Sequence, residues 1–329
     1  MNILIVRVSS LGDVVHNMPM LADLRRHVPD AQIDWVVEES YASLVRLNDS
    51  VRQVIPFALR RWRKSLGDAA TRAEMRAFRS ALRATPYDLV LDTQGLIKTG
   101  LVMRMARLAP GGRRIGLANA TEGSGYEALS RIFHTRSVPV APRTHAVQRA
   151  RDVAAAALGY AADGPADFNL RAPGRRPAWL PAQPYAVFFH GTARAAKQWP
   201  EAHWVALGQR IAARGLALLL PWGSAAERAA AERIAAGVPG AQVLPGLSLM
   251  EAVTLAQRAA LAVGVDTGLT HIAAAFERPT VELYCDSPRW KTEGNWSPRI
   301  INLGDAGAPP AVAQVETAAL ALLDLQPSR

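Results

Sequence analysis

The chain contains a single cysteine, Cys285, among its 329 residues, so no disulfide bond can form within it. No set of cysteines and histidines has the spacing of a structural zinc site. Residues 1–8 lack the basic start and the long apolar core of a signal peptide, and no run of 18 apolar residues occurs anywhere. We therefore expect a cytoplasmic protein without a membrane span.

Aromatic residues are scarce, at 6% of the chain, and glycines are missing where a dinucleotide-binding protein needs them. The turn Ser9-Ser-Leu-Gly-Asp13 has one glycine in place of the usual three. The similar string at residues 123–128 does not follow an expected strand, so we interpret it as a loop. These absences disfavour an NAD-dependent dehydrogenase. They also give little support to a non-enzymatic nucleic-acid-binding protein, because only one aromatic residue, Phe78, lies along the basic helix.

Positive charge is concentrated in the first half of the chain. Residues 1–172 hold 24 Lys and Arg against 16 Asp and Glu, which places +8 of the net charge of +10 there. The most basic positions lie in residues 60–64 and along one face of the helix expected next: Arg60, Arg61, Arg63, Lys64, Arg72, Arg76, Arg79 and Arg83. An anionic membrane surface, a phosphorylated substrate or nucleic acid would each fit this charge, and so would a plain solvated surface.

The order of apolar patterns predicts an α/β protein with two domains, and the length suffices for two cores of about 150 residues each. The first set of strands is expected at 2–8, 32–37, 53–56, 88–92 and 113–116, with helices at 14–26, 71–83, 97–108 and 144–157. A proline-rich segment, 161–184, interrupts this order and predicts a linker. The second set of strands is expected at 185–189, 216–220, 242–244, 260–265 and 280–284, before a last helix at 311–323 that we expect to pack back across the linker.

An anion site is indicated where the strand 260–265 meets the helix after it. Asp266 is placed to cap that helix, and the free amides of Thr267, Gly268 and Leu269 face outward, where the positive end of the helix dipole favours a phosphate. His271 lies within the first turn as a side-chain donor. The alternative is an ordinary capped helix of an α/β protein.

Other polar residues follow the expected strands at the same sheet edges. Asp13 is either a helix cap or a general base, and Glu227 is either a helix stabiliser or a ligand of ribose hydroxyls. Thr192 and Lys197 follow the strand 185–189, where phosphate ligands are expected. No Asp-x-Asp motif occurs, so we expect any bound diphosphate to be neutralised without a divalent metal.

Four motifs together resemble glycosyltransferase family 9, the bacterial lipopolysaccharide heptosyltransferases. They are the N-terminal segment 3–16, Asp92-Thr-Gln-Gly-Leu-Ile-Lys98, Lys197-Gln-Trp-Pro200 and Asp266-Thr-Gly-Leu-Thr-His271. The resemblance implies a GT-B fold, with two doubly wound Rossmann-like domains facing a central cleft. It implies an acceptor-binding domain at 1–165, a linker at 166–184, a nucleotide-sugar-binding domain at 185–310 and a C-terminal helix at 311–329.

The same resemblance implies a metal-independent, inverting enzyme without a cofactor. Its donor would be ADP-L-glycero-β-D-manno-heptose, and its acceptor the inner Kdo of Kdo2-lipid A. We expect a monomer that is cytoplasmic and peripheral to the anionic face of the inner membrane, and that binds no nucleic acid. Within the family the motifs are most similar to the type I enzymes, which add the first heptose of the inner core; type II or another GT-B nucleotide-sugar transferase is the alternative.

Carried over position by position, the resemblance assigns roles to single residues. Asp13 matches the general base. The residues that match the donor site are Thr192, Lys197, Glu227, Asp266, Thr267, Gly268, Leu269 and His271. Ala193 also matches a donor-site position, where the family often has a second hydroxyl residue. The residues that match the acceptor region are Arg60, Arg61, Arg63, Lys64 and Lys98.

Overall fold

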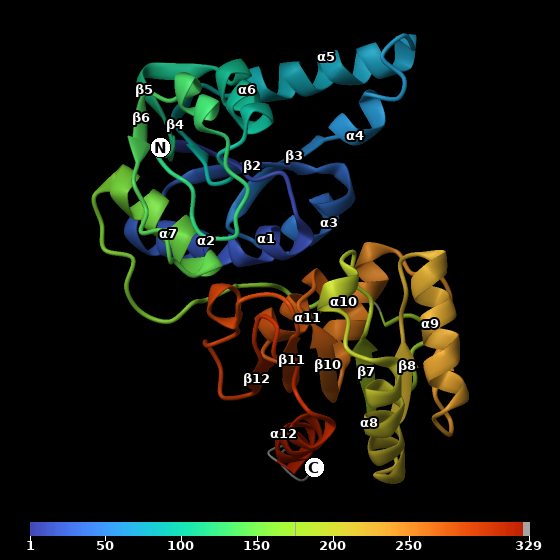
Figure 1. Cartoon of the computed structure of the whole chain (residues 1–329). Coiled ribbons are helices and arrows are strands. Elements are labelled where there is room, and N and C mark those ends of the chain that lie inside the picture. Colours follow the sequence, from blue (N-terminus) through green and yellow to red (C-terminus); the bar gives the residue numbers. More distant parts are fainter. Residues whose placement is uncertain (175, 325–329) are drawn as a thin grey trace. The chain divides into compact units, whose positions relative to one another are not determined.

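The computed structural model describes residues 1–174 and 176–324, and its chain divides into two compact units, Met1–Arg171 and Ala172–Arg329 (Figure 1). The boundary falls inside the linker expected at 166–184. We call these the N-terminal and C-terminal units and describe each by itself. Among the described residues, no helix combines the length and the apolar character needed to cross a membrane.

The N-terminal unit is built on a six-stranded parallel sheet in the order β3-β2-β1-β4-β5-β6. Its strands are β1 (Asn2–Val6), β2 (Gln32–Glu38), β3 (Val51–Phe57), β4 (Tyr87–Asp92), β5 (Leu108–Leu117) and β6 (Arg136–Val138). The central strands are apolar on both faces because helices cover both sides of the sheet. The last strand, β6, is a three-residue edge strand that the sequence pattern did not reveal.

Helices connect these strands: α1 (Leu11–His16), α2 (Met18–His27), η1 (Glu39–Tyr41), α3 (Ala42–Val45), α4 (Leu59–Trp62), α5 (Ala69–Ala84), α6 (Ile97–Met105), η2 (Ala128–Phe133) and α7 (Ala146–Leu158). One helix expected at 14–26 is in fact two, α1 and α2. A proline causes the break between the two helices. Pro19, in the first turn of α2, has no amide hydrogen to donate to the carbonyl of Val15, so the ladder of α1 ends at Asn17.

The C-terminal unit repeats this architecture with a second six-stranded parallel sheet, ordered β12-β11-β10-β7-β8-β9. Its strands are β7 (Tyr185–Phe189), β8 (Ala217–Leu220), β9 (Gln242–Val243), β10 (Leu261–Val265), β11 (Thr280–Tyr284) and β12 (Ile300–Gly304). Its helices are η3 (Ala195–Lys197), α8 (Glu201–Ala213), α9 (Ala225–Ala236), α10 (Leu249–Arg258), α11 (Gly268–Ala275), η4 (Arg289–Lys291) and α12 (Val312–Asp324). The edge strand β12 was not expected.

The last helix packs within its own unit. The apolar face of α12 packs on α8 and on the strands β10, β11 and β12 of its own unit. Val315, Ala319 and Leu322 are buried there in one core with Trp199 and Trp204. Hydrophobic burial stabilises that position, so this face completes the core of the C-terminal unit, and the expected packing of the helix across the linker stays a prediction. Residues 325–329 of the expected helix lie outside the described residues.

Both sheets are doubly wound, as the sequence predicted, and both have the same reversal in strand order. The first strand of each unit lies between its second and its fourth strand, so consecutive connections leave β1 and β4, and likewise β7 and β10, on opposite sides of the sheet. A crevice opens at the carboxyl ends of such a strand pair, and ligands of open α/β sheets bind there. The polar motifs of the sequence follow these four strands.

Candidate active site

In the N-terminal unit, Arg7 and Asp13 form an ion pair directly after β1. The distance between Arg7 Nη2 and Asp13 Oδ1 is 2.6 Å, and Arg7 Nη1 donates to the carbonyl of Thr93 after β4 at 2.6 Å. Asp13 Oδ2 also accepts hydrogen bonds from the backbone amide and hydroxyl of Ser10, which caps α1. Asp13 therefore stabilises the helix start, about a third of its side chain stays exposed, and its role as a general base stays a prediction.

The charge state of Asp13 follows from these contacts. Burial alone would raise the pKa of this carboxyl, but the guanidinium of Arg7, the hydrogen bonds of Ser10 and the more distant Arg149 hold the pKa well below its usual range. Asp13 is consequently an ionised carboxylate at neutral pH. Arg149 is itself buried, and its pKa is lowered to about 10, chiefly by that burial.

The neighbouring strand β4 ends beside these residues, because it pairs with β1. Asp92 is fully buried and accepts hydrogen bonds from the amides of Gln94 and Gly95 and from the hydroxyl of Thr99, which fixes the turn that starts α6. The side-chain oxygen of Gln94 in turn accepts a hydrogen bond from the backbone amide of Val8. The hydrogen bonds of the motif that begins at Asp92 thus connect β4 to β1 and to α6.

The structure gathers three of the five expected acceptor residues. Lys98 lies near Ser9, with Nζ 3.5 Å from the hydroxyl oxygen, and its pKa is lowered by partial burial and by the positive charges of Arg60 and Arg63. Glu38 at the end of β2 faces the same group. Two carboxylates, Glu38 and Glu127, act on Lys98 beside the cations Arg60 and Arg63, so the group keeps one positive charge in excess, which suits an anionic ligand.

The other two expected acceptor residues are placed differently. Arg61 forms bidentate ion pairs with both Glu39 and Glu74, at 2.7 to 3.2 Å, so its guanidinium joins α4 to η1 and α5. Trp62 donates to the same Glu74 at 2.9 Å. Lys64 is exposed at the end of this turn. We therefore assign Arg61 to the scaffold of this loop, while Lys64 remains a prediction.

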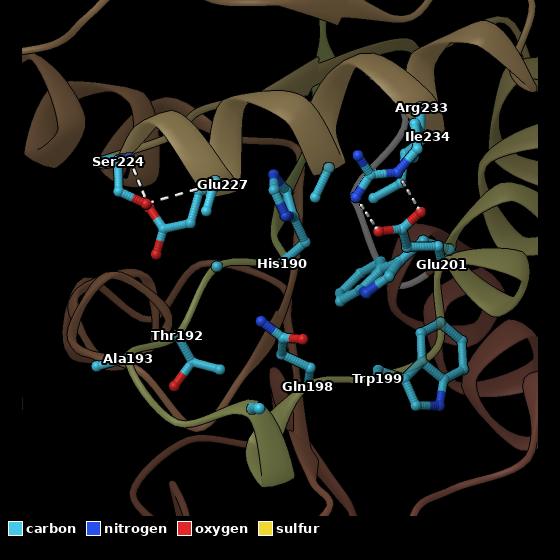
Figure 2. Close-up of a pocket in the computed structure, with 16 residues that line it drawn as sticks. His190, Thr192, Ala193, Gln198, Trp199, Glu201, Ser224, Glu227, Arg233 and Ile234 are labelled. Carbon is cyan, nitrogen blue, oxygen red and sulfur yellow. Dashed lines mark hydrogen bonds and ion pairs between the residues drawn. The ribbon is translucent and has the colours of Figure 1, made fainter.

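In the C-terminal unit, a pocket of about 680 Å³ opens beside β7, between the β7–α8 loop (residues 190–200) and α9. Figure 2 shows the labelled side chains of α9 on one side, those of the loop on the other, and His190 between them. Three of the expected donor residues line it: Thr192, Ala193 and Glu227. His190 also lines it. Burial lowers the pKa of this histidine, and its Nε2 has no hydrogen-bond partner among the described residues.

Glu227 points into this pocket from the first turn of α9. One carboxylate oxygen accepts the amide of Gly223 at 2.7 Å, while its own amide donates to the capping hydroxyl of Ser224. Gly191 faces it from the loop, and a Cβ added there would come within 2.7 Å of the Glu227 carboxyl carbon. Glycine at 191 therefore leaves the room that this carboxylate occupies.

A second cluster of polar side chains lies where β10 meets α11, and it includes Lys197 from the β7–α8 loop. Lys197 Nζ is 2.6 Å from Asp266 Oδ2, and His271 Nε2 is 3.0 Å from Asp266 Oδ1. The other ring nitrogen of His271 lies 2.9 Å from Glu282 in β11. Glu282 is fully buried and accepts further hydrogen bonds from the Tyr284 hydroxyl and the Gly294 amide. We call Lys197, Asp266, His271 and Glu282 the carboxylate–histidine network.

The two carboxylates beside the buried imidazole of His271 determine the charge of this ring. Burial would lower the pKa of His271, but Glu282 and Asp266 raise it to about 10, so the ring is an imidazolium at neutral pH. Both ring nitrogens face carboxylates, and only about 3% of the side chain is exposed. His271 thus supports Asp266, and its place in the donor site stays a prediction.

The start of α11 also differs in detail from the expectation. Thr267, not Asp266, is the N-cap residue, because the carboxylate of Asp266 is occupied by Lys197 and His271. Residues 266–269 are half-buried, and the first amides of the helix, those of Gly268 and Leu269, have no partner within the helix. A helix start with Lys197 beside it is suited to bind a phosphate.

Sequence reasoning missed four residues that hold these sites: Arg7, Arg149, His190 and Glu282. A charged residue within an apolar segment is the signal that was available. Glu282 interrupts the apolar strand β11, and Arg149 lies on the buried face of α7. A charged side chain is buried only when it is paired. Glu282 and Arg149 therefore each indicate a partner in the fold, but the sequence does not identify that partner. Among the described residues, no group of three or more His, Cys, Asp or Glu side chains is arranged to hold a metal ion.

Comparison with known proteins agrees with this geometry. A family model described as glycosyltransferase family 9 (heptosyltransferase) matches residues 75–320. The lipopolysaccharide heptosyltransferase 1 of Pseudomonas aeruginosa is 43% identical over 285 residues, covering 86% of this chain and 78% of that protein. Three relatives named heptosyltransferase 2 are 25% or 26% identical.

Solved structures match along nearly the whole chain. The structure of E. coli heptosyltransferase WaaC with ADP has a TM-score of 0.83 and 34% identity, covering 98% of this chain and 100% of the other. The same enzyme with ADP-2-deoxy-2-fluoro heptose has a TM-score of 0.77 and 35% identity, covering 98% of both chains. These matches confirm the expected GT-B fold. Together with the family match and the sequence identity, they establish that this chain belongs to glycosyltransferase family 9, the heptosyltransferases.

Proposed function

We propose that this protein is a type I heptosyltransferase, which moves L-glycero-D-manno-heptose from ADP-heptose to the inner Kdo of Kdo2-lipid A. One observation carries the proposal. The β7–α8 loop contributes both to a pocket with a carboxylate, Glu227, and to a cationic helix start beside Lys197. A nucleoside diphosphate needs this pair of sites, one for ribose hydroxyls and one for phosphates. The WaaC structures with ADP and with an ADP-heptose analogue support such a donor.

In the proposed reaction, the C-terminal unit stabilises the leaving group. The bond between C1 of heptose and the phosphate oxygen breaks through an oxocarbenium-like state, and negative charge develops on ADP. Lys197 and the amides of Gly268 and Leu269 are positioned to bind that charge. The carboxylate–histidine network keeps Lys197 in place, because Asp266 is itself held by the buried imidazolium of His271. Fixed donors of this kind act without reorganisation as the charge develops.

The N-terminal unit is proposed to bind the acceptor and to accept the proton. A hydroxyl of Kdo attacks C1 from the face opposite the leaving phosphate, so the anomeric centre inverts, and Asp13 takes the proton as the new C–O bond forms. Arg60, Arg63 and Lys98 are positioned to attract the acidic sugars or lipid phosphates. We further propose that the reaction needs no divalent metal, because these protein cations offset the charge on both substrates.

The acceptor places the enzyme at the cytoplasmic face of the inner membrane, to which we propose it binds peripherally as a monomer. A type II enzyme would use the same donor and differ in its acceptor. The greater identity to the type 1 relative favours the type I assignment.

The test is ADP release from ADP-L-glycero-β-D-manno-heptose, with and without Kdo2-lipid A, in the presence of a chelator. Release that depends on this acceptor and survives metal removal supports both the assignment and the metal-free phosphate site. Release that needs an acceptor already carrying heptose would keep the donor site and reject type I. Release lost with the chelator and restored by magnesium would reject metal independence.

A further inference from the structure

Exposed apolar side chains gather on one part of the N-terminal unit. Among the described residues, seven large hydrophobic side chains are exposed, and four of them belong to α6 or η2. These four are Ile97, Leu101, Leu129 and Ile132, with exposed fractions of 37%, 50%, 65% and 72%. We call them the apolar patch. Such exposure is costly for a protein that meets only water, so a clustered set indicates a binding surface.

The two elements that carry the patch are packed together, so their outward faces form one surface (Figure 1). A Cβ added at Gly100 would collide with the ring of Phe133, which shows how closely η2 lies on α6. The backbone amide of Ile97 donates to Glu127 just before η2, at 2.6 Å. Ile97 and Leu101 are one helical turn apart, and Leu129 and Ile132 are three residues apart on a 3-10 helix, so each pair shares one face.

Positive charge predominates in the segments that carry the patch. Residues 97–108 and 128–138 together contain five Lys and Arg and no Asp or Glu: Lys98, Arg104, Arg107, Arg131 and Arg136. The four arginines of this set are exposed. The acidic Glu127, in the loop between the two segments, has one carboxylate oxygen occupied by the amide of Ile97. Leucine and isoleucine side chains with arginines around them are typical of a surface that lies in the interface of an anionic bilayer.

The patch also begins next to the proposed acceptor site. Ile97 directly precedes Lys98, whose Nζ is 3.5 Å from the hydroxyl of Ser9. The loop before η2 is bonded to the same turn, since the amide of Glu127 donates to the carbonyl of Gly95 at 2.9 Å. A bilayer in contact with the patch would present lipid headgroups within about one helical turn of the proposed site.

We propose that the apolar patch docks the protein on an anionic lipid surface, with Leu129 and Ile132 inserted at the headgroup boundary and the surrounding arginines on the phosphates. The role of this surface rests on the proposed function, because docking next to Lys98 serves an acceptor whose sugars project from the membrane. Charge complementarity selects a bilayer over a second copy of this chain, whose own patch would bring the same arginines together.

The test is cosedimentation of the full-length protein with vesicles of phosphatidylglycerol and phosphatidylethanolamine. Leu129→Ser with Ile132→Ser should weaken binding by a factor of about ten or more, because both apolar contacts with the bilayer are lost. The matched control is Leu66→Ser with Met75→Ser, which removes two other exposed apolar side chains, 55% and 38% exposed, near the arginines of α5. This control should bind as the wild type does, and thermal unfolding should show that both variants fold.

Equal binding by the wild type and the patch variant, or an equal loss in the control, would overturn the proposal. A wild-type dimer that the patch substitutions separate into monomers would also overturn it, in favour of self-association. ADP release with detergent-dispersed Kdo2-lipid A tests the proposed function separately. Normal release together with unchanged vesicle binding by the patch variant rejects only the docking surface, whereas absent release with patch-dependent vesicle binding rejects only the transferase assignment.

Discussion

Asp13 is a weak base in this structure, since Arg7 holds its pKa low, and this limits how it can act in catalysis. A general base is most effective when its pKa is near the working pH. The attacking hydroxyl, however, becomes strongly acidic as its oxygen bonds to an oxocarbenium-like carbon. A weakly basic carboxylate can accept that proton late in the step. Orientation of the hydroxyl and late proton acceptance are therefore the roles that the geometry allows.

We predict that Asp13→Asn lowers kcat by roughly a hundredfold or more while ADP-heptose binding is retained. Single-turnover kinetics and calorimetric titration with ADP-heptose measure the two quantities. Asn keeps the size of the side chain but loses the negative charge beside Arg7, so the thermal unfolding of the variant is the necessary control. Loss of donor binding together with a large drop in Tm would show that Asp13 is structural.

Lys197 is held beside the start of α11 by its ion pair with Asp266. We predict that Lys197→Ala costs about 2 to 4 kcal/mol of transition-state stabilisation, or roughly a factor of 30 to 1,000 in kcat/KM, because one fixed donor to the leaving phosphate is lost. The matched control is Arg194→Ala in the same loop, since Arg194 is paired with Asp286 on the surface at 2.6 Å. Steady-state ADP release measures both. Unchanged turnover of Lys197→Ala would remove Lys197 from the mechanism.

His271 makes stability depend on pH. Its pKa is raised from 6.5 to about 10 on folding, so its contribution is fully present below pH 6.5 and is lost as the pH rises through 10. The change is on the order of a few kcal/mol. We predict that the free energy of unfolding of the wild type, measured in urea, falls between pH 6.5 and 10 more steeply than that of His271→Gln. Glu282→Gln should move the loss to lower pH. Parallel curves for all three proteins would contradict the prediction.

At the scale of secondary structure, the β7–α8 loop can lie close to α9 because residue 191 of the loop is a glycine and has no side chain. A methyl group at position 191 would push the flexible carboxylate of Glu227 out of the pocket, since the two would be 2.7 Å apart. We predict that Gly191→Ala raises KM for ADP-heptose about tenfold, the effect of losing one hydrogen bond to a charged group, with little change in Tm. Adding Glu227→Ala should cause little further loss. A full second loss would show that the two positions act independently.

The control for that prediction is Gly67→Ala, because no atom lies within 4 Å of a Cβ at that position. Its effect on the free energy of unfolding should stay within about 0.5 kcal/mol, as for other surface substitutions. A comparable rise in KM in this variant would mean that the change at Gly191 is not local.

The elements that the sequence predicted well are those with long apolar periods. The buried central strands and the helices between them were located within a few residues, because burial on both faces gives a continuous apolar run. The edge strands β6 and β12 were missed. An edge strand has one neighbour and partial exposure, and β12 is half-buried along most of its length, so its pattern is weak. Packing partners, as for α12, were not predictable because an apolar face does not specify which surface covers it.

The candidate site shows the same division at the level of single contacts. Residues at the carboxyl ends of β1, β4, β7 and β10 were predictable, since position after a strand and local motif indicate them. The ion pairs between these side chains were not predictable from the sequence. Arg7 with Asp13 and His271 with Glu282 join residues from different elements, and only the three-dimensional arrangement brings them within 3 Å. The sequence therefore located the expected binding edges of the two sheets, while the charge states of Asp13 and His271 required the structure.

The whole molecule carries its charge unevenly, and this asymmetry predicts different responses to salt. The N-terminal unit has a net charge of +8 and the C-terminal unit +2, so the long-range attraction for anionic substrates comes mainly from the former. Exposed cations such as Arg60 and Arg63 are screened when the Debye length falls, from about 10 Å at 0.1 M salt to about 3 Å at 1 M. Lys197 is paired within 2.6 Å and four-fifths buried, so salt screens it less.

We predict that raising NaCl from about 50 to 500 mM increases KM for detergent-dispersed Kdo2-lipid A several-fold, whereas the inhibition constant of ADP changes by less than about twofold. Detergent dispersion separates this effect from docking on a bilayer. The control is Arg60→Gln with Arg63→Gln, which should raise KM for the acceptor at low salt and flatten its salt dependence, because the screened charges are already absent. If both substrates respond equally to salt in the wild type, the acceptor does not depend on the basic half of the molecule, and its binding site must be sought outside the group formed by Arg60, Arg63 and Lys98.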